Sequence, residues 1–231
     1  MLNIISKIKC FLTKRLGLSL NSVPNAQGLL ITSPIEHNSQ EKIDEFYSNP
    51  NFVSSYLDSN RLNFYKQTVY FFKNMTNLEY SNKQIADVGC GTGHLLMSIR
   101  ELNFDVFLTG FEYSKAALKL AKKNLPEANF FYYDIYDKLD YKFDIVFCTE
   151  VLEHLLYPHI ALQNIIHLSQ DSGVIMITVP NGRIDTFEGH INFWSPESWK
   201  VFIESNISDQ EFEVKVGLID NLTNFAILKR I

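Results

Sequence analysis

Apolar and polar positions alternate in blocks along most of the chain. From residue 84 onwards, short apolar runs followed by turn residues alternate with longer stretches of helical periodicity. The runs at 143–148 and 174–179 are apolar on both faces, which is typical of parallel strands covered by helices on both sides. We predict strands over 84–88, 106–111, 129–133, 143–148 and 174–179, and helices over 92–102, 115–124 and 160–168.

The end of the chain has a different pattern. Residues 212–219 and 225–228 are apolar runs on either side of Asp220-Asn221, which is a turn signal. We therefore expect a sheet of seven strands, mostly parallel, that ends in an antiparallel hairpin. Open sheets of this kind bind ligands beyond the carboxyl ends of their strands, so the residues that follow each strand are the candidates for chemistry.

The first 40 residues form a segment of another kind. Apolar side chains in residues 1–16 recur at helical spacing with basic residues between them, namely Ile4, Ile5, Ile8, Phe11, Leu12 and Leu16. Such a helix either makes weak contact with an anionic membrane surface or docks on the protein or on a partner subunit. Residues 17–40 show no periodicity and are interpreted as a linker that ends in a helix start near residue 41.

Residues 41–80 are predicted to form a helical cap. Helices are expected over 41–48 and 53–74, joined at Asn49-Pro50-Asn51. The second helix carries many aromatic side chains, which indicates that it is buried against the domain that follows. The predicted organisation is a basic segment and linker (1–40), a helical cap (41–80) and a ligand-binding α/β domain (81–231).

Composition and charge narrow the function. Hydrophobic residues make up 46% of the 231 residues, which excludes an intrinsically disordered chain. The net charge is −5, and four basic residues with no acid among the first 20 leave −9 for the rest. Because so acidic a body is a poor partner for a phosphate backbone, we do not expect nucleic acid as a substrate.

Cysteine usage and hydropathy bear on the cellular setting. The three cysteines, Cys10, Cys90 and Cys148, match neither a metal-binding spacing nor a disulfide framework. No window approaches 18 consecutive apolar residues, so the sequence predicts no transmembrane helix. A reduced, cytoplasmic setting is the simplest interpretation.

A glycine-rich loop follows the first predicted strand and runs Asp87-Val-Gly89-Cys90-Gly91-Thr-Gly93-His94. The dinucleotide fingerprint would place its third glycine where His94 stands. An acid two residues before the first glycine suits a ligand that carries an ammonium group rather than a pyrophosphate. The D-x-G-x-G-x-G spacing resembles motif I of class I S-adenosylmethionine-dependent methyltransferases. The alternative is a structural turn in another α/β domain.

This resemblance implies S-adenosylmethionine as the cofactor and S-adenosylhomocysteine as its product, and it extends to the next two loops. Glu112 ends the second strand, where an acid can accept hydrogen bonds from both hydroxyls of a ribose. The resemblance puts Glu112 on the ribose of the cofactor and Tyr113 against its adenine. It likewise puts Asp134 on the adenine amino group and the backbone of Ile135 on a ring nitrogen. By itself, Asp134 is more simply interpreted as a surface loop acid, and its assignment depends on the glycine loop and Glu112 being in register with it.

A second motif, FDIVFCTEVLEHL, occupies residues 143–155. It resembles the motif after strand four in a large group of methyltransferases that includes the ubiquinone-biosynthesis O-methyltransferases. The resemblance implies that Thr149 and Glu150 flank the methionine part of the cofactor and that His154 lies near the methyl group. In similar enzymes an N-terminal arginine pairs with the carboxylate of the cofactor, which makes Arg61 a candidate. An ordinary surface arginine is the alternative.

The same motif raises the question of a metal ion. One subgroup of these enzymes is thought to hold a divalent cation with E-x-x-E-H, and Glu150, Glu153 and His154 match that spacing. A hard cation would need more oxygen ligands than this loop supplies. We therefore predict that no metal is bound and that Glu153 is a buried, hydrogen-bonded acid that shapes the loop.

A long polar and aromatic loop follows the fifth strand, from Val179 to Trp199, and loops in this position commonly carry substrate contacts. Many similar proteins have a histidine, then an aromatic residue and S/T-P-E here, and this chain has His190 before Ser195-Pro196-Glu197. Because imidazole exchanges protons near neutral pH, His190, or otherwise His154, is the candidate general base. The alternative role is to tie down the loop by hydrogen bonds.

These motifs occur in the family's order, each after a predicted strand. They predict an α/β fold with a Rossmann-like, mostly parallel seven-stranded sheet, helices on both faces, an antiparallel C-terminal hairpin and an N-terminal helical cap. The expected activity is methyl transfer to a small-molecule acceptor, most simply to a hydroxyl oxygen of a sugar, a phenol or a secondary metabolite. The alternatives are N- or C-methylation, a protein methyltransferase, a non-catalytic cofactor-binding regulator, and a nicotinamide-dependent oxidoreductase, which His94 disfavours.

Overall fold

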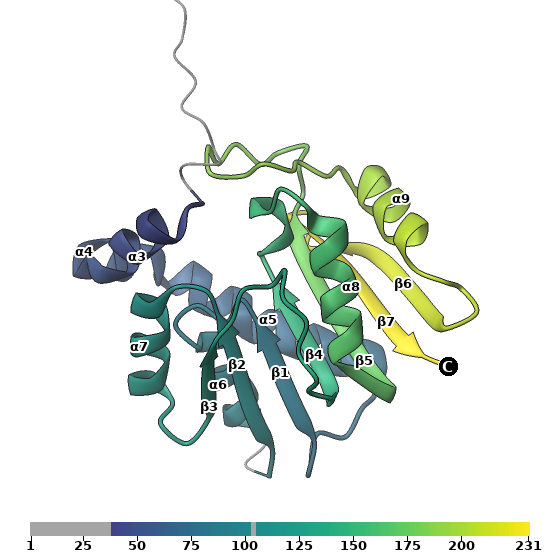
Figure 1. Cartoon of the computed structure of the whole chain (residues 1–231). Helices are drawn as coiled ribbons and strands as arrows, with labels where there is room; N and C mark the ends of the chain where they lie inside the picture. Colours follow the sequence, from purple (N-terminus) through teal and green to yellow (C-terminus); the bar gives the residue numbers. More distant parts are fainter. Residues whose placement is uncertain (1–37, 103–104) are drawn as a thin grey trace, which may run out of the picture. The chain divides into compact units, whose positions relative to one another are not determined.

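The computed structural model describes residues 38–102 and 105–231, which all belong to one compact unit, Pro34–Ile231 (Figure 1). The predicted basic helix over residues 1–16 and most of the predicted linker lie outside these residues. Within the described part of the chain, no helix is both long and apolar enough to cross a membrane. The elements in chain order are α3 (Gln40–Ser48), α4 (Pro50–Tyr56), α5 (Ser59–Thr76), β1 (Gln84–Val88), α6 (His94–Leu102), β2 (Phe107–Glu112), α7 (Lys115–Asn124), β3 (Asn129–Tyr132), β4 (Phe143–Thr149), the 3₁₀ helix η2 (Leu152–His154), α8 (Pro158–Leu168), β5 (Ser169–Pro180), α9 (Pro196–Asn206), β6 (Phe212–Ile219) and β7 (Thr223–Arg230).

The seven strands form one sheet in the order β3-β2-β1-β4-β5-β7-β6. Strands β1 to β5 pair with one another in parallel. Strand β7 is antiparallel to both of its neighbours, β5 and β6. Asp220 and Asn221 adopt positive φ angles of 49° and 59°, the conformation of a type I′ hairpin turn. The predicted fold class is therefore confirmed, and the strand order reverses direction at the β1–β4 pair, where such sheets bind their ligands.

Helices cover both faces of the sheet, and each face has its own apolar core (Figure 1). One core joins α5, α6 and α7 to the sheet, and in it the rings of Phe72 and Phe147 meet with centroids 4.8 Å apart. The other core joins α8 and α9 to the opposite face and contains the fully buried Leu162 and Trp199. Because successive side chains of a strand point to opposite faces, Phe147 enters the first core and Cys148 the second.

The N-terminal helices differ from the prediction in their boundaries. We expected one helix over 53–74, but the structure has α4 and α5, separated at Leu57-Asp58. Pro50 opens α4 instead of joining two helices, and the Asn49 side chain caps it by accepting hydrogen bonds from backbone N–H groups. Asp58 then caps α5 by accepting a hydrogen bond from the backbone N–H of Arg61 at 2.8 Å. These local caps set the helix boundaries, which the aromatic pattern alone did not indicate.

A second correction concerns the start of β5. We expected Ser169 to Gly173 to close the preceding helix, but α8 ends at Leu168 and β5 begins at Ser169. Ser169 pairs with Phe143, and the next pair is Ile145 with Val174, so residues 170–173 form an irregularity in the ladder. The turn-forming residues of this segment therefore bulge out of a strand that already pairs with β4.

Candidate active site

The glycine loop after β1 has a backbone that only glycine adopts readily. Gly89, Gly91 and Gly93 all have positive φ angles, of 77°, 50° and 82°. The N–H groups of Gly89 and Cys90 donate to the carbonyl oxygen of Phe111 at 2.8 and 3.0 Å, which fixes the loop against the end of β2. The loop is thus fixed at the carboxyl end of β1, and its three glycines leave the backbone there without side chains.

Glu112 and Asp87 lie on either side of this loop, and both are buried. The Glu112 carboxylate accepts hydrogen bonds from the N–H of Gly91 at 2.8 Å and of Ser114 at 2.7 Å. Burial raises the pKa of Glu112, while these backbone hydrogen bonds act in the opposite direction. Each carboxylate oxygen of Glu112 keeps a second lone pair with which it can accept a hydroxyl.

Asp87 has an even less ordinary environment. It is 2% exposed, and its Oδ1 has no hydrogen-bond partner among the described residues. Burial, with a smaller contribution from the nearby charge of Glu112, raises the pKa of Asp87 to about 8. A buried carboxylate with an unsatisfied oxygen is costly. The Asp87 carboxylate therefore suits a cationic or hydrogen-bond-donating ligand, such as the ammonium group of an amino-acid moiety.

The residues predicted for adenine recognition follow β2 and β3. The ring of Tyr113 stacks on that of Tyr132, with centroids 5.9 Å apart. Asp134 is half-buried and accepts a hydrogen bond from the backbone N–H of Tyr136 at 3.0 Å. Ile135 is buried in the core, and its carbonyl oxygen accepts from Asn164 Nδ2 at 2.8 Å. Hydrogen bonds on either side therefore fix the Asp134-Ile135 backbone where it follows the strand.

Glu150 directly follows the buried last residue of β4, Thr149, and the charge of Arg61 acts on it. Glu150 has a positive φ of 56° and accepts a hydrogen bond from Thr178 Oγ1 at 3.2 Å. Burial raises the pKa of Glu150 to about 7, and the positive charge of Arg61 acts in the opposite direction. The Arg61 guanidinium lies over the ring of Tyr56, 4.8 Å from its centroid. Arg61 is therefore turned towards the site rather than towards solvent.

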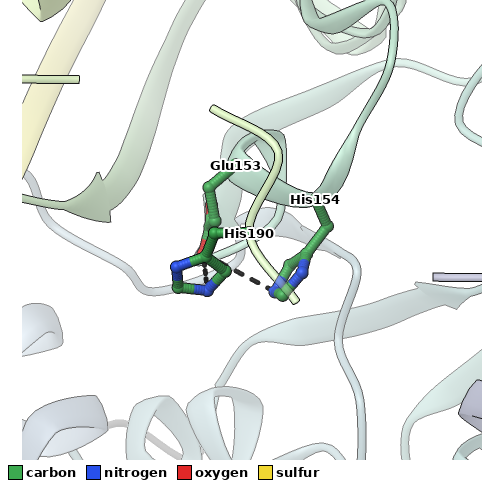
Figure 2. Close-up of side chains that lie close together, drawn as sticks. All are labelled: Glu153, His154 and His190. Atoms are coloured by element: carbon green, nitrogen blue, oxygen red, sulfur yellow. Dashed lines mark ion pairs between the residues drawn. The ribbon is translucent and has the colours of Figure 1, made fainter. Parts of the chain in front are cut away.

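Two histidines and two acids come together beside η2, and Figure 2 shows three of them, Glu153, His154 and His190; the second acid is Asp185. His190 Nε2 and His154 Nε2 lie 3.9 and 3.8 Å from Glu153 Oε1, and the two imidazole rings are 4.6 Å apart. The Nδ1 of His190 lies 2.5 Å from Asp185 Oδ2. The Nδ1 of His154 lies 3.2 Å from the carbonyl oxygen of Gly189, which can only accept, so the ring donates there. The loop after β5 thus completes a cluster that begins in η2.

Glu153 is the centre of this cluster. It is 1% exposed, and neither of its carboxylate oxygens has a hydrogen-bond partner in the described part of the chain, contrary to our prediction of a hydrogen-bonded side chain. Burial, together with the charge of Glu150, raises the pKa of Glu153 well above its usual value. Only its backbone shapes the loop, because its carbonyl oxygen accepts from the N–H groups of Ile191 and Asn192 at 2.8 and 3.0 Å.

Glu153, His154 and His190 could also hold a metal ion. Each offers one ligand atom, and these atoms lie within 4.8 Å of one another. One carboxylate and two imidazoles form a donor set that suits a transition metal better than a hard cation. The sequence motif indicated Glu150 in place of His190, so the structure changes the composition of the candidate metal site. The prediction that no metal is bound stays a prediction.

Sequence reasoning missed the residues with which α3 covers the glycine loop. Asp44 Oδ1 accepts hydrogen bonds from Ser114 Oγ at 2.5 Å and from the backbone N–H of Ala116 at 3.0 Å, at the start of α7. The hydroxyl of Tyr47 lies 3.3 Å from the position that a Cβ on Gly91 would take. The abundance of aromatic side chains in 41–80 was the only sequence signal for this cover.

Comparisons with known proteins agree with this geometry. A family model described as a methyltransferase domain matches residues 79–217. The ubiquinone biosynthesis O-methyltransferase of Glaesserella parasuis serovar 5 is 33% identical over 110 residues, which are 43% of this chain and 46% of that protein. The putative methyltransferase 235L of invertebrate iridescent virus 6 is 25% identical over 123 residues, 53% and 46% of the two chains. The chain therefore matches about half the length of these curated relatives.

Solved structures show the same fold. The plantazolicin methyltransferase BpumL, solved in complex with SAH, superposes with a TM-score of 0.62 at 16% identity and covers 86% of this chain and 98% of its own. The family model spans more than half of the chain, and its match contains the glycine loop, the three strand-end acids and the histidine cluster. The chain therefore belongs to the methyltransferase domain family of the class I S-adenosylmethionine-dependent methyltransferases.

Proposed function

We propose that this protein transfers a methyl group from S-adenosylmethionine to a hydroxyl oxygen of a small molecule. The observation that carries the proposal is the placement of three acids, Asp87, Glu112 and Asp134, at or beside the carboxyl ends of the adjacent parallel strands β1, β2 and β3. In this fold ligands bind along that edge. The candidate base lies beside the carboxyl end of β4, the next strand of the same sheet.

Each end of the cofactor has a group of matching chemistry. Asp87 receives the ammonium group, because its unsatisfied buried oxygen needs a donor. Arg61 pairs with the carboxylate, and Thr149 and Glu150 flank the methionine chain. The loop of Gly89, Cys90, Gly91 and Gly93 lets the ligand approach the backbone closely. Glu112 accepts hydrogen bonds from the ribose hydroxyls, and Tyr113 lies against the adenine. Asp134 and the backbone of Ile135 form hydrogen bonds with the edge of the adenine.

The reaction requires little covalent chemistry from the protein. The acceptor oxygen attacks the methyl carbon in line, the sulfur–methyl bond breaks, and the sulfonium becomes a neutral thioether. The proton of the acceptor hydroxyl passes to His190, with His154 as the alternative base. Because charge is neutralised as the reaction proceeds, the enzyme contributes mainly by aligning donor and acceptor and by excluding water. Helices α3 to α5, which cover the glycine loop, supply that exclusion.

A small acceptor is favoured by this cover and by the curated relatives. Tyr47 of α3 reaches the glycine loop, with its hydroxyl 3.3 Å from the position of a Cβ on Gly91, and the charge of Arg61 of α5 acts on Glu150, so side chains of both helices cover this part of the proposed site. The relatives that the chain resembles include several ubiquinone biosynthesis O-methyltransferases. N- or C-methylation, a protein acceptor and a cofactor-binding regulator without activity are the alternatives. We also propose that the protein acts in the cytoplasm, as its unpaired Cys90 and Cys148 would allow.

Calorimetric titration with S-adenosylhomocysteine tests the proposal. We expect micromolar affinity, and a roughly tenfold or greater loss in both Glu112→Ala and Asp134→Ala, because each removes a charge-assisted hydrogen bond of about 1.5–3 kcal/mol. Glu79→Ala, on a surface acid before β1, is the matched control and should bind as the wild type does. Absence of binding, with no cofactor already bound by mass spectrometry, would refute the proposal.

A further inference from the structure

Asp185 is a largely buried acid that none of the sequence motifs singled out. It lies in the loop after β5, and its side chain is only 9% exposed. Its two oxygens have different partners: Oδ1 accepts from the backbone N–H of Phe187 at 3.1 Å, and Oδ2 lies 2.5 Å from His190 Nδ1. The carboxylate therefore bridges the loop backbone and the imidazole of the candidate base.

The contact with Asp185 decides which nitrogen of His190 carries the proton. A carboxylate accepts, so Nδ1 of the neutral ring must be the protonated nitrogen. The lone pair of the ring is then on Nε2, which is the nitrogen that faces Glu153 at 3.9 Å. In water the two neutral forms interconvert freely, and a carboxylate partner selects one of them. Asp185 thus presents the basic nitrogen of His190 towards the cluster in Figure 2.

Neighbouring rings hold the imidazole in that orientation. Phe187 meets His190 with centroids 4.9 Å apart and an interplanar angle of 64°, and His154 lies on another side at 4.6 Å. The side chain of His190 is only 10% exposed. Because the ring is enclosed, the tautomer set by Asp185 also sets the direction in which the lone pair points.

Hydrogen bonds other than the Asp185–His190 contact also hold the loop. The backbone N–H groups of Ile191 and Asn192 bind the carbonyl oxygen of Glu153, and Asn192 Nδ2 donates to the carbonyl oxygen of Leu155 at 2.7 Å. His190 N–H also donates to the carbonyl oxygen of Phe187 at 3.1 Å. The first bonds fasten residues 191–192, directly after the imidazole, to η2 and its C-cap, and the last closes a turn before it, so the loop has anchors other than Asp185.

We propose that Asp185 is a positioning residue for methyl transfer, which holds His190 in the Nδ1–H tautomer with its basic Nε2 directed at the reaction. The expected effect of Asp185 on turnover rests on the proposed function, because it assumes that the protein transfers methyl groups. The tautomer itself can be observed without any acceptor. The two claims can therefore fail separately.

The test combines spectroscopy and kinetics. Protein with ¹⁵N-labelled histidine is examined by NMR at a pH of about 8.5, two units above the usual histidine pKa of about 6.5. The signals of His190 are assigned by their absence in His190→Gln. We expect proton-bearing Nδ1 and bare Nε2 in the wild type, and the reverse in Asp185→Asn. The asparagine keeps an oxygen for the Phe187 N–H, but it offers an N–H donor to the imidazole.

Turnover is measured as S-adenosylhomocysteine release with 3,4-dihydroxybenzoate and a panel of other phenols and sugars. By analogy with the loss that the wrong tautomer causes in serine proteases, Asp185→Asn should reduce kcat by roughly 10²–10⁴-fold. The KM for the acceptor and the affinity for S-adenosylhomocysteine should stay within about threefold of the wild type. Glu188→Gln, which removes an exposed acid from the same loop, is the matched control and should leave kcat unchanged.

Three results would overturn the inference. A wild-type His190 with its proton on Nε2 would contradict the geometry directly, and so would an Asp185→Asn variant that keeps the wild-type tautomer. A switched tautomer with a kcat equal to that of Glu188→Gln would show that the orientation of His190 does not matter for the reaction. If no acceptor in the panel reacts, the NMR result alone decides whether Asp185 sets the tautomer, and the question of the acceptor returns to the proposed function.

Discussion

The proposed cofactor end and the proposed acceptor end of the site are built differently, although both lie at the same edge of one sheet. At the cofactor end, Asp87, Glu112 and Asp134 lie in the strands β1 and β2 or within two residues of the end of β3. At the acceptor end, Asp185 and His190 lie well beyond the end of β5 and reach the site through contacts with η2. One end is positioned by strand geometry, and the other by contacts between two loops.

This difference indicates which properties of the enzyme can change independently. The strands β1 and β2, which carry Asp87 and Glu112, are buried and paired on both sides, so their ends have little freedom, whereas β3, which precedes Asp134, is an edge strand paired with β2 alone. The loop after β5 can alter its length or side chains while η2 and the glycine loop stay in place. With the proposed assignment of the two ends, changes in the loop after β5 can alter which acceptor is used while the cofactor site stays the same. The first prediction below tests the acceptor end and the other two test the cofactor end.

The largest expected effect separates catalysis from cofactor binding. His190→Gln should lower turnover by roughly 10²–10⁴-fold, because it removes the candidate general base and keeps a polar side chain of similar size. The affinity for S-adenosylhomocysteine, measured by calorimetry, should change less than twofold, since His190 belongs to the acceptor end. His167→Gln, on a half-exposed histidine of α8, controls for the loss of an imidazole as such and should keep full activity.

Metal analysis of the same preparations checks the role of His190. Our prediction is that purified protein contains no stoichiometric divalent metal and that a chelator leaves turnover unchanged. One equivalent of metal that His190→Gln loses would instead identify His190 as a ligand together with Glu153 and His154. A parallel loss of cofactor affinity would mean that the two ends of the site are not independent.

The two ends were also unequally predictable from the sequence. The glycine spacing and the strand-end acids are local patterns, and the structure puts them at one edge because parallel strands end together. Glu153 and His154 were recognised by a motif, but their proximity to His190 depends on how the loop after β5 folds back on η2. Asp185 carried no local signal, since a loop acid becomes a partner of an imidazole only through tertiary structure.

The helical boundaries show the same limit. Asp58 and Asn49 are ordinary capping residues, and their sequence positions could have indicated the starts of α5 and α4. The aromatic residues around them form a continuous pattern that predicts one longer helix instead. The contacts of Asp44 with the start of α7 join segments 70 residues apart, and no periodicity predicts such a contact.

The second prediction tests the glycine loop at the proposed cofactor end. A Cβ on Gly89 would lie 2.3 Å from Cγ2 of Val151, which follows β4, and Gly89 has a φ of 77°. Gly89→Ala should therefore weaken S-adenosylhomocysteine binding on the order of 100-fold, about 2.8 kcal/mol, from backbone strain and displacement of Val151. Gly91 has a φ of 50°, and a Cβ at this position would meet only the hydroxyl of Tyr47, at 3.3 Å. Gly91→Ala should therefore weaken S-adenosylhomocysteine binding only a few-fold.

A double variant separates strain from steric conflict at this contact. Gly89→Ala with Val151→Ala removes the conflict but keeps the positive φ, and it should recover about tenfold of the lost affinity. Calorimetry on the four proteins gives the comparison. Equal losses in Gly89→Ala and Gly91→Ala would mean that close approach of the ligand, rather than the contact with Val151, limits the loop.

The smallest expected effect is a pH dependence that belongs to the cofactor end alone. Burial raises the pKa of Asp87 to about 8, so the folded protein holds a proton there that the unfolded chain releases above about pH 4. A group with a raised folded-state pKa stabilises the protein below its unfolded pKa, and that contribution is lost as the pH rises through about 8. In the proposed binding mode the ammonium group of the cofactor pairs with the charged carboxylate of Asp87, so binding should release this proton. Affinity for S-adenosylhomocysteine should then rise by about tenfold between pH 6 and 8, less than the full linkage slope because other groups still bind the ligand.

Calorimetry in two buffers of different ionisation enthalpy measures the released proton, and Asp87→Asn is the control. That variant should bind more weakly and without the pH dependence, whereas a profile identical to the wild type would assign the titration to another group, such as Glu112, whose pKa is raised in the same direction.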